Sequence, residues 1–272
     1  MSQYKEYQFI LQSPENQREI FIALLAQAGF EGFVETGQGF LAYTDTTIHP
    51  DEVLKDLNWP YQLEEKNIKE ENWNQSWEQQ IKPLVIDNRI YIKTSFHPDK
   101  KLPIVITIDP KMSFGTGHHE TTYLMIKQML EIDLHAKDVI DMGAGTGVLS
   151  ILAKKMHANN VTAIDNDKWA YENMIENFEK NKTGMIKAIH GDAKVLSDLP
   201  AADVFLANIN RNILLQDMHQ YISKIKSGGL LILSGFYQQD VPLLEEEALK
   251  YGMIFESKRV KNDWTSLTFR KK

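Results

Sequence analysis

Asp138-Val139-Ile140-Asp141-Met142-Gly143-Ala144-Gly145-Thr146-Gly147-Val148-Leu149-Ser150-Ile151-Leu152-Ala153 is the stretch that decides the fold of this chain. A short apolar run ends in the carboxylate of Asp141, glycines then recur at alternate positions, and apolar residues follow at helical spacing. This pattern predicts a buried strand that turns sharply into a helix. Glycines permit positive φ values and let a ligand approach the backbone closely. We therefore expect unpaired N–H groups at the start of this helix, where an electron-rich ligand edge can bind.

The spacing of the glycines distinguishes two kinds of ligand. A dinucleotide-binding turn has the pattern G-x-G-x-x-G, whereas Gly143, Gly145 and Gly147 form G-x-G-x-G. A second apolar run ends in Asp165, and an acid at this position can bind both hydroxyls of a ribose. A tight turn without a ligand is the alternative interpretation. The turn resembles that of doubly wound S-adenosylmethionine-dependent methyltransferases more than that of dehydrogenases.

Composition excludes several classes of function. The 272 residues contain no cysteine, which removes disulfides, cysteine-ligated zinc and a cysteine nucleophile. Neither a membrane-spanning run nor a signal-peptide core is visible, so we expect a cytoplasmic protein without membrane partners. Residues 1–110 hold 17 acidic and 10 basic side chains, while residues 111–272 hold 20 of each. Such an acidic N-terminal part repels bare nucleic acid and attracts a basic partner, or is simply a solvated surface.

The N-terminal residues predict a small domain. Strand and helix patterns alternate as βαββαβ over residues 1–66, an α+β (ferredoxin-like) arrangement that serves protein or RNA binding. Residues 67–82 are polar and predict a helical linker, with Trp73 and Trp77 on one face as anchors for a neighbouring domain. Residues 83–272 then form the second domain.

The second domain predicts a doubly wound α/β fold. Strand and helix patterns alternate along it, which indicates a mostly parallel sheet covered on both faces, with a hairpin at the end. Ligands bind beyond the carboxyl ends of such strands, where Asp141, Asp165, Asp192 and Asn208 are predicted to lie. A sulfonium cofactor fits this set. The carboxylates favour its positive charge, Asp165 can bind its ribose, and Asp192 can bound its adenine. Methyl transfer mainly requires positioning of the reactants.

A third motif lies in residues 114–122, Phe-Gly-Thr-Gly-His-His-Glu-Thr-Thr, directly before an apolar-periodic helix. Small and hydroxyl residues there can supply donors to a bound ligand. Its adjacent histidines point in different directions and lack a carboxylate at helical spacing, so we expect no metal. The better interpretation is a loop histidine that donates a hydrogen bond.

These motifs together resemble the PrmA family of ribosomal protein L11 methyltransferases, within class I of the S-adenosylmethionine-dependent enzymes. The resemblance covers nearly the whole chain, including Trp73…Trp77, the 114–122 motif, Asp165-x-Asp167, Asn208-Ile209 and Trp264. It implies a seven-stranded, mostly parallel methyltransferase sheet and an N-terminal domain that recognises the substrate. It also implies that the following residues contact S-adenosylmethionine: Thr122, Gly143, Asp165 and Asn208. The glycine turn and the strand ends add Gly145, Asp141 and Asp192 to this prediction.

The resemblance implies methyl transfer to lysine or N-terminal α-amino groups of a basic protein of the large ribosomal subunit. We predict that Asn208 orients the acceptor amine and rank it above His119, which is the second candidate. Asn210 and Arg211 depart from the small apolar residues usual in the family, and we expect them to border the acceptor pocket. We expect a monomer.

Two other functions stay open on sequence alone. A methyltransferase acting on another protein or on rRNA bases is the first. Base-methylating enzymes usually place Pro-Pro and an aromatic after the fourth-strand Asn or Asp, and Asn208-Ile209-Asn210 lacks them. A non-catalytic assembly factor that only binds the cofactor is the second.

Overall fold

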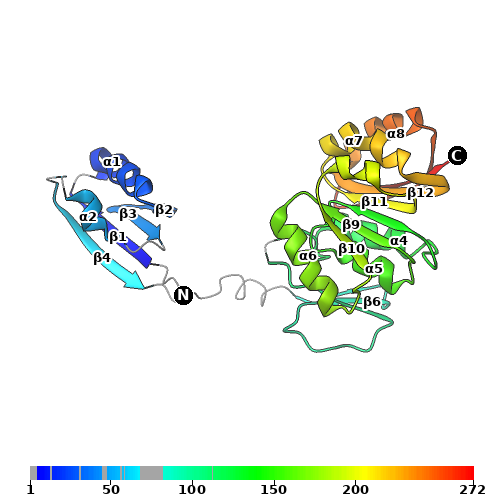
Figure 1. Cartoon of the computed structure of the whole chain (residues 1–272), viewed down its shortest axis with the longest axis horizontal. Helices are drawn as coiled ribbons and strands as arrows, with labels where there is room; N and C mark the ends of the chain where they lie inside the picture. The colour runs from blue at the N-terminus through cyan, green and yellow to red at the C-terminus, as the bar shows by residue number, and fades with distance from the viewer. Residues whose placement is uncertain are drawn as a thin grey trace. The chain divides into compact units, whose positions relative to one another are not determined.

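The computed structural model describes residues 5–12, 14–30, 32–44, 48–55, 57, 59–67, 82–111 and 113–272. The chain forms two compact units, Met1–Ser76 and Trp77–Lys272 (Figure 1). Trp73 and Trp77 lie outside the described residues, as does most of the predicted linker helix.

A four-stranded antiparallel sheet with two helices makes up the first unit. Its elements are β1 (Lys5–Leu11), α1 (Pro14–Gln27), β2 (Gly32–Thr36), β3 (Gly39–Thr44), α2 (Pro50–Leu54) and β4 (Tyr61–Asn67). The strands lie in the order β2-β3-β1-β4. Alternate side chains of β1 enter the core, where the ring of Phe9 stacks on that of Phe40 with centroids 4.6 Å apart. Phe21 of α1 packs against both rings, so this unit has an aromatic core of its own.

The second unit is built on a seven-stranded sheet. Its strands are β8 (Val139–Met142), β9 (Val161–Asp165), β10 (Ile186–His190), β11 (Ala202–Asn208), β12 (Ile225–Tyr237), β13 (Met253–Lys261) and β14 (Trp264–Lys271). They lie in the order β10-β9-β8-β11-β12-β14-β13. The first five are parallel, and β14 runs antiparallel to both of its neighbours. The predicted mostly parallel seven-stranded sheet is confirmed.

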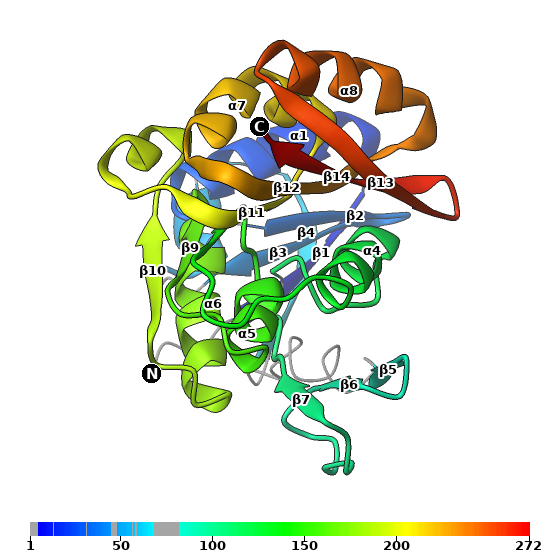
Figure 2. The same cartoon turned by 90° about the vertical axis from the view of Figure 1, so that its right-hand side faces the viewer.

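Helices cover both faces of this sheet. They are α4 (Glu120–Met129), α5 (Val148–Lys155), α6 (Lys168–Lys180), α7 (Arg211–Ser223) and α8 (Val241–Lys250), with short 3₁₀ turns η1 (Ala193–Asp198) and η2 (Gln238–Asp240). Figure 2 shows α4, α5 and α6 on one face and α7 and α8 on the other. Successive residues of β11 serve the two faces: Val204 and Leu206 enter one core, Phe205 and Ala207 the other. Burial on both faces explains why the strands are continuously apolar.

A three-stranded sheet precedes the large one. It contains β5 (Leu84–Ile86), β6 (Ile90–Lys93) and β7 (Ile104–Thr107), with β6 in the middle. Residues 83–96 predict a hairpin that turns at Asp87 and Asn88. β5 and β6 form this hairpin, and Asp87 and Asn88 at its tip have φ values of 51° and 52°. Positive φ at both positions matches the twist of the two strands. Ile86, Ile90 and Ile106 join the core that contains α4 and α5.

Two predicted boundaries are wrong. The apolar run of residues 230–233 predicts a strand there, but the strand spans Ile225–Tyr237, because Ile225 pairs with Ala202 and β14 pairs with the rest as far as Tyr237. The sequence also predicts a last helix over residues 245–251, but this helix begins at Val241. A proline in its first turn is compatible with that start, since the first N–H groups of a helix have no partner within the helix.

Candidate active site

The glycine turn joins β8 to α5 at the carboxyl end of the sheet. Gly143, Gly145 and Gly147 have φ values of 70°, 55° and 78°, a region that L side chains rarely adopt. A Cβ on Gly145 would also lie 2.3 Å from the carbonyl oxygen of Phe114, and one on Gly143 would lie 2.2 Å from a methyl carbon of Ile209. The glycines are therefore required by close packing of protein on protein.

The N–H groups of this turn are all engaged, contrary to our expectation of free donors. Residues 143 and 144 donate to the carbonyl of Ile164, residue 145 to Asp165, residue 146 to the carbonyl of Phe114 and residue 147 to that of Ala144. The acceptors come from β9, from the 114–122 loop and, for residue 147, from the turn itself. The turn thus contributes a fixed surface to a ligand, and ligand-binding polar atoms must come from side chains beside it.

Asp165, the last residue of β9, connects the turn to the next helix. Its Oδ2 accepts from Gly145 N–H at 2.8 Å, and its Oδ1 accepts from Asp167 N–H at 2.9 Å. Asp167 is the N-cap of α6 and accepts from Ala170 N–H, as predicted for a helix start. The carboxylate is 8% exposed and each of its oxygens can accept another hydrogen bond. It is therefore held in place with acceptor capacity left for a diol.

Asp141 lies beneath the turn and is 1% exposed. Its Oδ2 accepts from the hydroxyl of Ser150 at 2.7 Å, while its buried Oδ1 has no hydrogen-bond partner in the described part of the chain. Burial raises the pKa of this carboxyl to about 7, and the negative charge of Asp165 adds to the increase. A buried, unpaired carboxylate oxygen is costly, so a cation or N–H donor bound here would be stabilised.

Asn208 ends β11, the strand beside β8. Ala207 pairs with Met142, the last residue of β8, so Asn208 follows at the level of Gly143, the first glycine of the turn. The side-chain N–H donates to the hydroxyl of Thr122 at 3.3 Å, and Thr122 is 1% exposed in the first turn of α4. The Oδ1 of Asn208 is buried and lacks a partner among the described residues. The structure thus brings Thr122, Asn208 and the glycine turn together.

His119 has a different environment from that of Asn208. It is the N-cap of α4: its Nδ1 accepts from Thr121 N–H at 3.3 Å and lies 2.9 Å from the Thr121 hydroxyl. Its ring is edge-on to Phe114 and Trp264, with centroids 5.1 and 4.8 Å away. The ring therefore orders the 114–122 loop, and Nδ1 is an acceptor in the contact with Thr121 N–H, whereas we expected a donor.

Asp192 lies two residues beyond the end of β10 and caps η1. It accepts from Lys194 N–H at 2.9 Å, and this bond holds the pKa of its carboxyl below the usual range. Its side chain is half exposed. The carboxylate lies at the outer end of the row formed by the strand ends of β11, β8, β9 and β10.

That Asn210 and Arg211 border the acceptor pocket stays a prediction, but both side chains also have local structural partners. Asn210 is the N-cap of α7 and accepts from Ile213 N–H at 3.2 Å. Arg211 forms an ion pair with Asp240, with 2.7 Å between Nη1 and Oδ1. These contacts are with the start of α7 and with η2, which explains the departure from apolar residues by local structure.

Sequence reasoning missed Ser150, Ile209 and Gly235. Ser150 supplies the only hydrogen bond that the described residues give to Asp141 Oδ2, and its signal was a hydroxyl within an otherwise apolar helix start. Ile209 is enclosed by two glycines, since a Cβ on Gly235 would lie 2.1 Å from its carbonyl oxygen. The sequence held no signal for that contact, because Ile209 follows β11 whereas the two glycines follow β8 and lie in β12.

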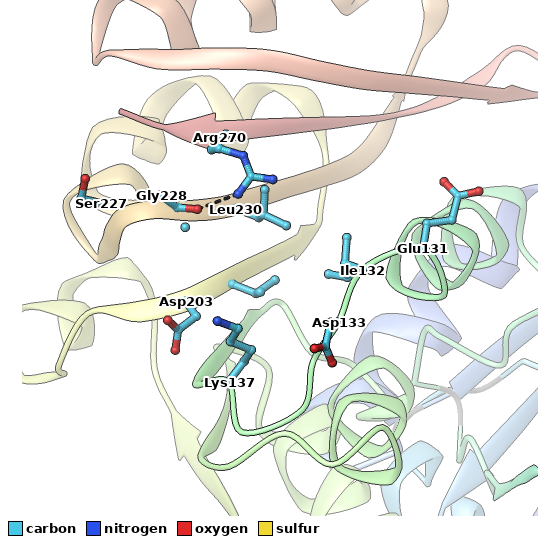
Figure 3. Close-up of a pocket in the computed structure, with 11 residues that line it drawn as sticks. Glu131, Ile132, Asp133, Lys137, Asp203, Ser227, Gly228, Leu230 and Arg270 are labelled. Carbon is cyan, nitrogen blue, oxygen red and sulfur yellow. Dashed lines mark hydrogen bonds between the residues drawn. The ribbon is translucent and has the colours of Figure 1, made fainter.

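The opposite end of the sheet holds a separate cavity of about 380 Å³ (Figure 3). Lys137, Asp203 and Arg270 are among the residues that line it. The Arg270 guanidinium donates to the carbonyl of Gly228 at 2.8 Å and pairs with Glu256, while Asp203 accepts from Lys226. Asp203 and Arg270 thus already have charged partners, whereas the carboxyl end holds buried acceptors without a partner among the described residues and is the better site.

Two kinds of site are not found in the described ranges. No group of three or more His, Asp or Glu side chains there is arranged to hold a metal ion. No described helix is long and apolar enough to span a membrane.

Comparisons with known proteins agree with the motifs. The model of the family described as ribosomal protein L11 methyltransferase (PrmA) matches residues 15–272. A protein of Phocaeicola vulgatus with that name is 42% identical over 264 residues, covering 94% of each chain. One of Porphyromonas gingivalis, also so named, is 42% identical over 267 residues, covering 94% of this chain and 91% of the relative. A crystal structure of ribosomal protein L11 methylase from Lactobacillus delbrueckii subsp. bulgaricus matches with a TM-score of 0.62 and 26% identity, covering 70% of this chain and 99% of that one.

The family predicted from residues 114–122 and from the strand ends is thus confirmed by matches that extend along nearly the whole chain. This chain belongs to the family of ribosomal protein L11 methyltransferases.

Proposed function

We propose that this chain transfers methyl groups from S-adenosylmethionine to lysine or N-terminal amino groups of ribosomal protein L11. The family and the names of the relatives support the reaction and the substrate. The structural observation that carries the proposal is the pair of buried, unpaired oxygens, Asp141 Oδ1 and Asn208 Oδ1, at the ends of the neighbouring strands β8 and β11. A positively charged cofactor and the amine that accepts the methyl group can each supply a hydrogen-bond donor to one of these oxygens.

The residues present fit the cofactor. Asp165 has acceptor capacity for both hydroxyls of a ribose, and the protein already holds its carboxylate in one orientation. Asp141 Oδ1 would accept from, and attract, the positive end of the ligand. Asp192 and the glycine turn would bound the remaining parts of the ligand. When bound, S-adenosylmethionine supplies a methyl group that is already activated by its positive sulfur, so the protein needs no covalent nucleophile.

Asn208 then positions the acceptor amine. Its N–H is occupied by Thr122, which leaves Oδ1 as the free end of the side chain. An amine attacks only when it is neutral, yet free lysine titrates near ~10.4 and an α-amine near ~8. Desolvation and a nearby positive charge both lower the pKa of the amine. Asn208 Oδ1 accepts one of its hydrogens and thereby aims the lone pair at the methyl group.

The first unit is proposed to bind the substrate. Residues 1–76 carry 13 acidic and 5 basic side chains, which favours a basic protein over bare nucleic acid. Deletion of residues 1–66 should therefore retain cofactor binding and abolish methylation of intact L11. Circular dichroism controls for folding of the remainder. A truncated enzyme that methylates the intact protein at normal efficiency contradicts this assignment.

The proposed reaction is tested with purified protein and methyl-labelled S-adenosylmethionine. We expect label in purified ribosomal protein L11, in amines identified by mass spectrometry, and none in purified rRNA. Asn208→Ala is the matched control and should bind cofactor while transferring little label. Label in rRNA alone would identify a base methyltransferase, and cofactor binding without any transfer would identify an assembly factor.

A further inference from the structure

Two asparagines on α6 and a third at its C-cap form a row that no role in ligand binding explains. Asn173, Asn177 and Asn181 are four residues apart, so they share one face of the helix. Asn173 is 2% exposed and Asn177 is fully buried. Buried amides are rare in helix interiors unless their donors and acceptors are satisfied. The question is therefore which groups these side chains satisfy.

Their first partner is the backbone that continues β7. Asn181 both accepts from Thr107 N–H at 2.9 Å and donates to Thr107 carbonyl at 2.6 Å. Two residues later, Asp109 N–H donates to Asn177 Oδ1 at 3.1 Å, and Asp109 carbonyl accepts from Asn173 at 2.8 Å. Alternate residues of a strand direct their backbone groups to the same edge. The asparagine row thus pairs with this edge as a neighbouring strand would.

Asn177 alone in this row also reaches the glycine turn, among the contacts of the described residues. Its Nδ2 donates to the carbonyl oxygen of Thr146 at 3.0 Å. Thr146 N–H and hydroxyl are bound by the carbonyls of Phe114 and Gly115 at 2.9 and 2.7 Å. Asn177 therefore contacts both Asp109 and Thr146, and Thr146 in turn contacts Phe114, five residues after Asp109 in the sequence.

These contacts extend to Asp165, the residue proposed to bind the ribose. Thr146 is bonded to Gly145, whose N–H holds Asp165 Oδ2 at 2.8 Å. The Thr146 carbonyl lies in the peptide after Thr146 and the Gly145 N–H in the peptide before Gly145, so the bond from Asn177 restrains the turn two peptide units from the donor that orients the Asp165 carboxylate. Asn181 and Asn173 contact the same strand edge, and within the described part of the chain neither forms a hydrogen bond to the turn.

We propose that Asn177 is a positioning residue for the cofactor: it fixes the glycine turn, and through it Asp165, without touching the ligand. This inference rests on the proposed function. Loss of Asn177 leaves Thr146 carbonyl free to turn toward water, so the binding-competent arrangement of the turn becomes a minor state. The measured affinity for S-adenosylmethionine falls in proportion to the population of that state. Saturating cofactor restores the rate of methylation.

The test compares Asn177→Ala with Asn181→Ala and Asn173→Ala in the full-length protein, below the melting temperature of each. Calorimetry should give a Kd for S-adenosylmethionine that is about tenfold higher in Asn177→Ala, as expected from the loss of one or two hydrogen bonds. The Kd should change by less than about threefold in both controls. Steady-state kinetics should show a raised KM for the cofactor with kcat and the KM for L11 nearly unchanged. Hydrogen exchange without cofactor should be faster at Gly145 N–H in Asn177→Ala only.

Asn177→Asp is measured in parallel in case the alanine variant does not fold, since it keeps an acceptor for Asp109 N–H and removes the donor to Thr146. Equal weakening in all three alanine variants, or a lowered kcat with unchanged Kd, assigns a merely structural role and overturns the inference. Wild-type protein that fails to bind S-adenosylmethionine contradicts the proposed function itself. Wild-type binding with an unshifted Asn177→Ala affinity overturns this inference alone.

Discussion

The backbone N–H of Gly145 donates to Oδ2 of Asp165 at 2.8 Å, which joins the glycine turn to the end of the next strand. Asp165 Oδ1 accepts from Asp167 N–H in the same way. A single carboxylate therefore sets the relative positions of β9, the turn and α6. The residue that we propose for the ribose is also the residue that organises the site around it.

Asp165→Ala removes both this anchor and the acceptor for the diol. We expect the Kd for S-adenosylmethionine to rise by about 100-fold, because charged hydrogen bonds contribute roughly 1.5–3 kcal/mol. Asp192→Ala is the control: its carboxylate is half exposed and should change the Kd by less than about fivefold. Isothermal calorimetry measures both, and equal affinity in wild type and Asp165→Ala would refute the assignment.

Gly143→Ala tests the packing of the turn. The added Cβ would meet Ile209 at 2.2 Å in a backbone with φ of 70°. We expect the free energy of unfolding to fall by about 2 kcal/mol or more, with weaker cofactor binding. Gly184→Ala is matched, since its Cβ meets nothing within 4 Å, and should change stability by less than about 0.5 kcal/mol. Thermal unfolding measures the stability of both variants, and similar losses of stability at both glycines would contradict the packing argument.

Asn208→Ala and His119→Ala separate the two catalytic candidates. Removing Asn208 Oδ1 should lower kcat by about 100-fold, because the amine loses the group that aims it. Removing His119 deletes a helix cap and should cost about 1 kcal/mol of stability with a smaller effect on kcat. Single-turnover methylation at saturating cofactor is measured from pH 7 to 10. A larger defect in His119→Ala that recovers at high pH would make this histidine a general base.

Asp141 should make the stability of the ligand-free protein depend on pH. Its folded pKa of about 7 lies above the ordinary value of 3.8, so the folded state holds a proton that the unfolded chain has released between these two values. The free energy of unfolding should therefore fall as pH rises through this window, by a few kcal/mol on the order expected for such a shift. Urea unfolding at pH 4 to 8 measures it.

Asp141→Asn is the control for this effect, because an amide does not titrate. Its stability relative to wild type should increase from pH 4 to pH 8. A constant difference between the two proteins over that range would show that Asp141 is ionised in the folded state throughout.

The main elements of the second unit could be predicted from local patterns. Apolar runs of strand length, glycines between a strand and a helix, and Asp167 at a helix start all act within a few residues. The strand ends Asp141, Asp165 and Asn208 followed from the same patterns, because a parallel sheet brings carboxyl ends to one edge. Boundaries such as that of β12 did not, since pairing with β14 extends the strand beyond its apolar run.

The sequence by itself therefore determined which elements form and which polar residues gather at one edge of the sheet, because periodicity and strand ends are local properties. Tertiary structure alone decided which hydrogen-bond partners these residues have. The donors of the glycine turn are taken by Phe114, Ile164 and Asp165, and Thr146 is held by Asn177, 31 residues further along the chain. Such pairings depend on how distant segments meet in the folded core, and residue spacing carries no signal for them.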